Sequence, residues 1–167
     1  WAYKDVPRRV IVEQLLLDRG MLPANIRFHV FDGRVRLIHV NERVPVPAGM
    51  ELRNVNRTND WFDGDFTPLV VQLDQTAPSA PVRPEKPRNF AEMTRIALRL
   101  AEDFEYCRVD LYSVEGRTYF GEITQYPSGG MRRFTPPDFD AALGEIWRTG
   151  AALPQRFYAR PDAAPGG

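Results

Sequence analysis

The spacing of hydrophobic residues predicts strands in the first third of the chain. Residues 10–17 open with a β-branched apolar run and predict a buried strand. Two further apolar runs, residues 26–31 and 35–40, flank the pair Asp32-Gly33. Because glycine adopts positive φ angles without steric cost, such a pair between two runs predicts a β-hairpin.

The middle of the chain predicts one clear helix after less regular structure. Residues 52–58 are predicted as a short strand, and the aromatic and acidic segment 59–67 as an ordered loop. Four prolines in residues 77–87 are typical of an extended connector. A helix is predicted over residues 89–104, with Asn89 as its N-cap. Its apolar stripe has helical spacing and consists of Met93, Ile96, Ala97, Leu100 and Ala101.

The last third of the chain predicts a second hairpin and a second helix. Residues 107–114 and 118–124 predict two strands joined at Glu115-Gly116. The second helix is predicted from Thr135, with a proline at its first position, to Gly150. Residues 151–167 are predicted as a C-terminal tail.

Two acidic residues of the second hairpin are candidates for chemistry. A two-residue turn at Glu115-Gly116 would pair Asp110 with Gly121 and place Glu122 on the opposite face of the sheet. A three-residue loop, with Gly116 as a bulge residue, would instead set Asp110 directly across from Glu122. Their Cβ atoms would then lie about 4.5–5.5 Å apart.

Two carboxylates on one face of a sheet need a compensating charge. At ~5 Å and an effective dielectric constant of ~20 they repel each other by roughly 3 kcal/mol. Proteins tolerate this when one carboxylate is protonated or when a cation lies between them. Magnesium prefers such oxygen ligands, and Arg108 is placed to hold phosphate or a developing oxyanion. Acidic residues on strands also often face water, and Arg108 alone could pair with Asp110, so the spacing leaves both interpretations open.

Composition and charge exclude several classes of protein. The chain has 43% hydrophobic and 26% charged residues, which is typical of a globular protein. The 22 basic residues equal the 22 acidic residues in number, so we expect no nucleic-acid partner. The sequence has no apolar run of the ~20 residues that a membrane span needs. A single cysteine, Cys107, excludes an internal disulfide and favours a reducing, cytoplasmic location.

The two histidines are poor candidates for a metal site. His29 and His39 lie on adjacent predicted strands. A zinc site needs more ligands, and the sequence offers no further histidine and only one cysteine. We therefore predict a structural or surface role for both.

The run RVDLYSVEGRTYFGEITQYPSGG resembles the TupA-like family of ATP-grasp proteins, named for teichuronopeptide biosynthesis. Members show an Arg-Val-Asp strand, a glycine turn, a Tyr-Phe-Gly-Glu strand and a Tyr-Pro-x-x-Gly loop. The segment VIVEQLLLD resembles the family's hinge, LPANIRFHVFDGRVRLIHV its next strand pair, and NRTNDWFDGDF its acidic-aromatic loop. The resemblance covers roughly residues 8–147 and is most specific over residues 107–130.

The resemblance implies a fold and a domain division. The fold would be α+β (of the α/β type), an ATP-grasp C-terminal lobe with a mostly antiparallel sheet and two packing helices. Residues 1–150 would form a partial ATP-grasp domain with hinge strand, sheet and metal-binding hairpin. Residues 151–167 would be a tail.

The resemblance also implies roles for the matching residues. Asp110 and Glu122 would bind one or two magnesium ions that bridge the ATP phosphates. Thr124 would be a weaker third ligand, where the wider superfamily commonly has asparagine. Arg108 would contact the transferred phosphoryl group or stabilise the acyl phosphate, and Arg27 would lie near the phosphates.

The nucleotide's other end would meet the hinge. The hinge backbone would bind the adenine edge, and one of its leucines would line the ring; the hinge residues are Glu13, Gln14, Leu15 and Leu16. Asp18 would reach the ribose.

The activity implied by the resemblance is ATP- and magnesium-dependent ligation of a carboxylate to an amine through an acyl phosphate. The substrates would be cell-surface polysaccharides or their uronic and amino acid components. A kinase-like phosphotransferase and a nucleotide-binding relative without turnover are the alternatives. The chain begins at Trp1, so we expect it to be the C-terminal portion of a longer enzyme, inactive without an N-terminal lobe that supplies a flexible loop and lysines.

Overall fold

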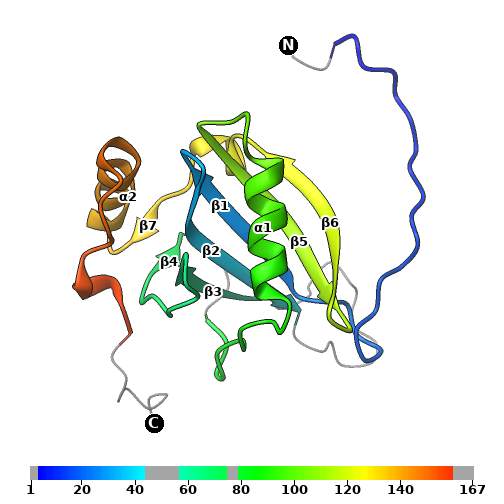
Figure 1. Ribbon diagram of the computed structural model, residues 1–167, viewed down its shortest axis with the longest axis horizontal. Helices are drawn as coiled ribbons and strands as arrows, with labels where there is room; N and C mark the ends of the chain where they lie inside the picture. The colour runs from blue at the N-terminus through cyan, green and yellow to red at the C-terminus, as the bar shows by residue number, and fades with distance from the viewer. Residues whose placement is uncertain (1–3, 44–56, 75–78, 160–167) are drawn as a thin grey trace.

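The computed structural model describes residues 4–43, 57–74 and 79–159, and a five-stranded sheet lies at its centre (Figure 1). The strand order is β3-β2-β1-β5-β6, and every neighbouring pair is antiparallel. The strands are β1 (Asn25–Phe31), β2 (Arg34–Arg43), β3 (Arg57–Asp63), β5 (Tyr106–Val114) and β6 (Arg117–Thr124). The predicted hairpin at Asp32-Gly33 is confirmed, since both residues have positive φ, 44° and 68°.

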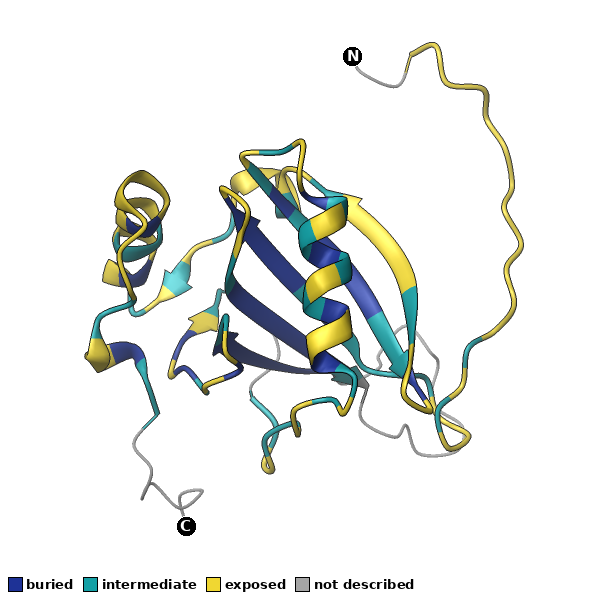
Figure 2. Ribbon diagram, viewed as in Figure 1, coloured by how far each residue is buried: buried dark blue, intermediate teal, exposed yellow. Residues whose placement is uncertain are grey.

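One face of the sheet is apolar and packs against helix α1 (Phe90–Leu100) (Figures 1 and 2). Alternation along β1 turns Phe28 and Val30 to this face, and both are fully buried. Met93 and Ala97 of α1 are also fully buried, so the predicted helical stripe is confirmed as core. Each large side chain buried here contributes about 1.5–3 kcal/mol of transfer free energy.

Helix α1 is shorter than predicted, because residues 101–103 form a turn after Leu100. Asn89 stands at the N-cap, but its side chain does not cap the helix. Its amide donates to Thr118 Oγ1 at 2.9 Å and accepts from Ser113 Oγ at 2.7 Å. Asn89 therefore ties the start of α1 to strands β5 and β6.

A second apolar cluster lies at the other face of the sheet, beside α2 (Asp138–Thr149). Two short strands, β4 (Gln72–Leu73) and β7 (Phe134–Thr135), pair next to it. Thr135 is therefore a strand residue, and the helix starts three residues later than predicted. Gly150 ends the helix as predicted, with φ at 70°. The cluster consists of Leu37, Trp61, Leu69, Val71, Phe139 and Phe157.

Residues beyond Gly150 also pack in the second apolar cluster. The 3-10 turn η3 (Gln155–Phe157) buries Phe157, whose carbonyl accepts from Val70 N at 2.8 Å. The division of the chain at residue 150 stays a prediction. Together, the antiparallel sheet and two helices confirm the α+β fold class.

Two predictions of strand and loop were wrong. Residues 10–17 do not form a buried strand: Val10, Ile11 and Val12 are 82–93% exposed, and no described strand pairs with them. A strand needs a neighbour for its N–H and C=O groups, which hydrophobicity alone does not supply. Residues 59–63 were predicted as loop but belong to β3, where pairing with β2 satisfies their backbone. Of the predicted strand 52–58, residues 52–56 lie outside the described residues.

Candidate functional site

Strands β5 and β6 place Asp110 opposite Glu122, by a route that neither of the two turn alternatives gave. The turn has two residues, Glu115 and Gly116, both with positive φ (51° and 76°). The extra residue lies further along, where the register shifts at Gly121 and pairs Asp110 with Glu122. A Cβ atom at Gly121 would lie 3.0 Å from the Asp110 carbonyl oxygen, so glycine permits the close approach of the two strands. Of the two alternatives, the two-residue turn is therefore present, but the bulge at Gly121 gives it the opposed carboxylates that were expected only from the three-residue loop.

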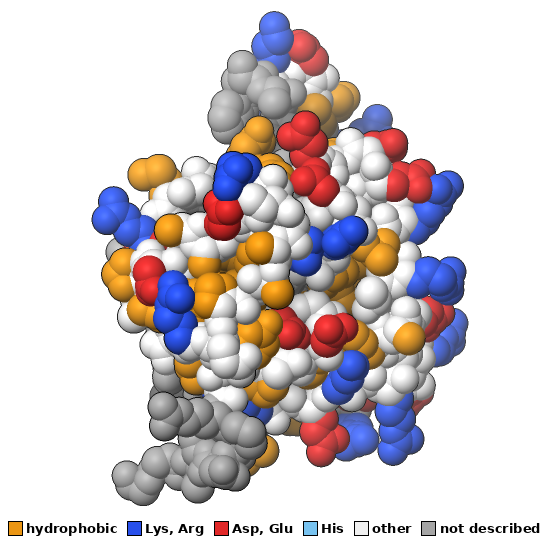
Figure 3. All heavy atoms as spheres, turned by 60° about the vertical axis from the view of Figure 1, so that its left-hand side comes forward, with side chains coloured by type: hydrophobic (Ala, Val, Ile, Leu, Met, Phe, Trp, Pro, Cys, Tyr) orange, Lys and Arg blue, Asp and Glu red, His pale blue; other side chains and the backbone are white. Residues whose placement is uncertain are grey.

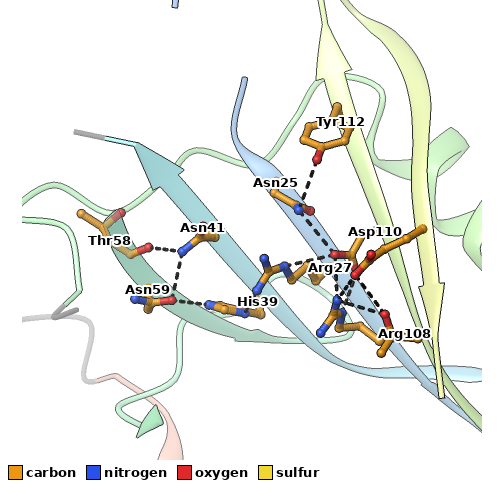
Figure 4. Close-up of polar contacts among 11 residues, drawn as sticks. Asn25, Arg27, His39, Asn41, Thr58, Asn59, Arg108, Asp110 and Tyr112 are labelled. Carbon is orange, nitrogen blue, oxygen red and sulfur yellow. Dashed lines mark hydrogen bonds and ion pairs between the residues drawn. The ribbon is translucent and has the colours of Figure 1, made fainter. Parts of the chain in front are cut away.

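A row of polar and aromatic side chains crosses the sheet on the face opposite α1. Pairing aligns Trp61, His39, Arg27, Asp110 and Glu122, one from each strand in the order β3, β2, β1, β5, β6. Figure 4 shows the hydrogen bonds and ion pairs that connect the middle of this row. Strand alternation therefore gathers on one face residues that are far apart in the sequence.

Asp110 is the buried centre of the site, with 1% of its surface exposed. Arg108 Nε donates to its Oδ1 at 2.6 Å, and Arg108 Nη2 donates to its Oδ2 at 3.0 Å. Arg27 Nε forms an ion pair with the same Oδ2 at 3.2 Å, and Asn25 Nδ2 donates to it at 3.4 Å. Two guanidinium groups thus compensate one buried carboxylate.

Glu122 lies on the open side of the same site, with its side chain 61% exposed. Arg108 Nη2 donates to Glu122 Oε1 at 2.5 Å and to Thr124 Oγ1 at 3.1 Å. Thr124 Oγ1 in turn donates to Glu122 Oε1 at 3.0 Å. One cationic nitrogen therefore lies among oxygen atoms of Asp110, Glu122 and Thr124, which are the predicted metal ligands.

Two clefts meet at this row. The hinge cleft, about 850 Å³, is lined by the predicted hinge and by both acidic residues; among its residues are Glu13, Gln14, Leu15, Leu16, Arg27, Asp110 and Glu122. The aromatic cleft, about 810 Å³, lies between the sheet, α2 and the turn η2 (Pro127–Gly130); among its residues are Arg27, Arg108, Arg132, Tyr106, Phe134 and Trp147. Arg27 and Asn41 line both clefts.

The structure brings together most, but not all, of the predicted site residues. Asp18 lies outside both clefts, where it forms an isolated bridge with Met21. Thr124 lines neither cleft but contacts Glu122 and Arg108.

The family comparison agrees with the geometry. The model of the TupA-like ATP-grasp family matches residues 1–148. The chain belongs to the TupA-like ATP-grasp family. Comparisons with curated proteins and with solved structures gave no match. Among the helices of the described residues, none has the length and apolar character to cross a membrane.

His39 is an integral part of the polar row of this TupA-like chain. Its ring stacks on Trp61 at 4.2 Å between centroids and an interplanar angle of 6°. Its Nε2 lies 2.8 Å from Asn59 Oδ1, and its Nδ1 lies 3.4 Å from Arg27 Nη1. Burial first, and the nearby Arg27 charge second, lower the pKa of His39 from 6.5 to about 3. The imidazole is therefore neutral at pH 7.

His29 is the second buried histidine of the ATP-grasp chain's polar face. Its Nδ1 lies 3.0 Å from the Tyr106 hydroxyl group, and it pairs in register with Arg108. Burial, followed by the charges of His39, Arg108 and Arg27, lowers the pKa of His29 well below 6.5.

Sequence reasoning missed several residues of the site. For His39 and His29 the prediction was a structural or surface role; both are buried, which agrees with the structural role and not with the surface one, and Asn25 and Asn41 were not considered. The signal was present in the alternation of the first hairpin, because Asn25, Arg27 and His29 share one face of β1. The aromatic cleft had no such signal, since α2 and η2 follow the sheet strands in sequence and only the fold brings them over it.

The two neutral histidines predict a loss of stability in acid. Because unfolding returns the pKa of His39 from about 3 to 6.5, stability is fully present above pH 6.5 and falls as the pH decreases toward 3. His39 alone should lose about 2 kcal/mol of unfolding free energy between pH 7 and pH 5, and His29 should add to the loss. Urea unfolding at both pH values measures this. His39→Asn should show a smaller pH difference than the wild type, and an equal difference would contradict the assignment.

Proposed function

We propose that this TupA-like chain is the metal- and phosphate-binding part of an ATP- and magnesium-dependent carboxylate–amine ligase that acts through an acyl phosphate in cell-surface polysaccharide biosynthesis. The observation that carries the proposal is the convergence of Asp110, Glu122 and Arg108 where the hinge cleft and the aromatic cleft meet. Such a junction allows ATP in one cleft and a second substrate in the other to approach one another.

The hinge cleft is the proposed nucleotide site. It is lined by the hinge, where backbone groups of Glu13 to Leu16 would bind the adenine edge. It is also lined by Arg27, Asp110 and Glu122, beside which the phosphates would lie. Asp18 is further away and stays only a prediction for the ribose.

The donor set at the junction fits magnesium. Asp110 and Glu122 offer carboxylate oxygens and Thr124 a hydroxyl oxygen, and magnesium commonly takes one or two carboxylates plus substrate phosphates. The oxygens already surround a cationic nitrogen of Arg108, which supports their ability to hold positive charge. No described group of three or more His, Cys, Asp or Glu side chains could hold a metal ion, so phosphate oxygens would have to complete the shell. When bound, magnesium would neutralise phosphate charge during transfer.

The aromatic cleft is the proposed site of the carboxylate substrate. Among its described lining residues are Arg27, Arg108 and Arg132 and one acidic residue, Asp140. Each arginine also pairs with a carboxylate outside this cleft: Arg27 and Arg108 with Asp110, and Arg132 with Asp74. Their remaining N–H groups can donate to a substrate carboxylate, which favours an anionic substrate over a protonated amine. Figure 3 turns the α2 side of the molecule forward and shows hydrophobic side chains gathered there, interspersed with acidic and basic ones.

The proposed chemistry follows from these positions. A substrate carboxylate oxygen attacks the γ-phosphorus of ATP, which gives an acyl phosphate and ADP. The amine then attacks the acyl carbon and loses a proton, and phosphate leaves with the former carboxylate oxygen. Arg27 would orient the phosphates, and Arg108 would stabilise the negative charge that develops on the transferred group and on the acyl oxygen.

Transfer of an isotope label tests the proposal directly. A uronic acid labelled with ¹⁸O in its carboxyl group is incubated with ATP, magnesium, an amino acid and the enzyme that contains this chain. The ligase should yield ADP, an amide and inorganic phosphate that carries ¹⁸O. A phosphoester without labelled phosphate would instead identify the kinase-like alternative. No ADP would identify a nucleotide-binding relative without turnover, the alternative that the weaker ligand Thr124 keeps open.

A further inference from the structure

The hydrogen bonds around His39 determine which ring nitrogen carries its proton. Asn41 Nδ2 donates to the Thr58 carbonyl oxygen and to Asn59 Oδ1, both at 3.0 Å, so Asn59 Oδ1 acts as an acceptor. His39 Nε2 lies 2.8 Å from the same oxygen and must donate to it. A neutral imidazole carries one proton, so His39 Nδ1 is an acceptor.

That acceptor faces Arg27. Arg27 Nη1 donates to His39 Nδ1 at 3.4 Å, while Arg27 Nε pairs with Asp110 Oδ2 at 3.2 Å. The guanidinium on β1 is thus held from β2 on one side and from β5 on the other (Figure 4). Stacking on Trp61 and burial to 5% exposure hold the imidazole plane, and the hydrogen bond from Nε2 to Asn59 holds the Nδ1 edge toward Arg27.

We propose that His39 is a positioning residue that aims the Arg27 guanidinium at the ATP phosphates. The inference rests on the proposed function, in which Arg27 contacts phosphate at the junction of the two clefts. Arginine has several rotatable bonds, and holding its planar group in place before ATP binds reduces the entropy lost on binding. The chain Asn41–Asn59–His39–Arg27 fixes the tautomer and, through it, the direction of the guanidinium.

Two substitutions of similar size separate positioning from packing. In the His39→Asn variant the side-chain oxygen is bonded to Cγ, as Nδ1 is in histidine. This oxygen can therefore still accept a hydrogen bond from Arg27. The amide of His39→Gln reaches the place of Nε2 and can contact Asn59 but not Arg27. Both variants lose the ring that stacks on Trp61, so a purely structural role of His39 would affect both alike.

The affinity for ATP with magnesium, measured by calorimetry, tests the inference. His39→Asn should stay within about threefold of the wild type. His39→Gln and Arg27→Gln should each bind ATP about tenfold more weakly than the wild type. The double variant, with both His39→Gln and Arg27→Gln, should bind ATP no more weakly than Arg27→Gln alone. Equal weakening in His39→Asn and His39→Gln, or no weakening in His39→Gln, would overturn the inference. Unchanged affinity in Arg27→Gln would instead refute the phosphate role of Arg27 in the proposed function.

A measurement on the unaltered protein is independent of whether the variants fold. The ¹⁵N NMR spectrum of the His39 ring should show a protonated Nε2 and an unprotonated Nδ1. A proton on Nδ1 would overturn the inference, because that nitrogen could then no longer accept from Arg27.

Discussion

Replacing Asp110 with alanine is expected to lower the free energy of unfolding by about 3 kcal/mol or more, although Asp110 lies in the candidate site and outside both apolar clusters. The carboxylate is 1% exposed and pairs with both Arg108 and Arg27. Its removal leaves two largely buried guanidinium groups without their shared counter-charge. Asp110→Asn should fall between the alanine variant and the wild type, because the amide keeps an acceptor oxygen but loses the charge.

Glu122→Gln is the matched control for this prediction. Glu122 also pairs with Arg108, but its side chain is 61% exposed, and exposed pairs contribute only ~0–1 kcal/mol. Urea unfolding of the three variants and the wild type measures the difference. An Asp110→Ala variant as stable as Glu122→Gln would contradict the role assigned to the buried carboxylate.

Replacing Arg108 with alanine is expected to lower kcat of the ligase by about 10²–10³-fold. In the proposed function its guanidinium lies where negative charge develops, between the two clefts. Arg108→Lys should recover only part of the loss, because an ammonium group supplies charge without the planar fork that contacts Asp110 and Glu122 together. Initial rates of ADP release at saturating ATP measure both variants.

Arg99 on α1 provides the control for the Arg108 variants. Its side chain is 77% exposed. In the part of the chain that the structure describes, it forms an ion pair with Glu102. Arg99→Ala should therefore keep the wild-type kcat. A similar kcat for Arg108→Ala and the wild type would contradict a catalytic role of Arg108.

Local turn chemistry made much of the sheet predictable. Asp32-Gly33 and Glu115-Gly116 are pairs that accept positive φ, and both are two-residue hairpin turns. The register at the site was harder to predict, because it depends on the bulge at Gly121 and not on the turn. A glycine inside a strand is itself a signal for such a bulge, but it does not say which way the register shifts.

Pairing between strands that are distant in sequence determined the structure of the two segments that were predicted wrongly. Asn59 and Asp60 look like loop residues, yet β3 pairs with β2 and buries both. Val10 to Val12 look like core residues, yet no described strand lies beside them. The family resemblance predicted a place near the phosphates for Arg27, which stays a prediction, whereas its contact with His39 required the pairing of β1 with β2.

The dependence of ATP binding on magnesium, compared between the wild type and Glu122→Gln, tests the central claim most directly. If Asp110 and Glu122 hold the metal that contacts the phosphates, adding magnesium should tighten ATP binding to the wild type, and Glu122→Gln should lose about tenfold or more of that gain. Because Glu122 is exposed, the variant should remain folded, and unfolding curves check this. An identical magnesium effect in both proteins would contradict the assignment of the metal site.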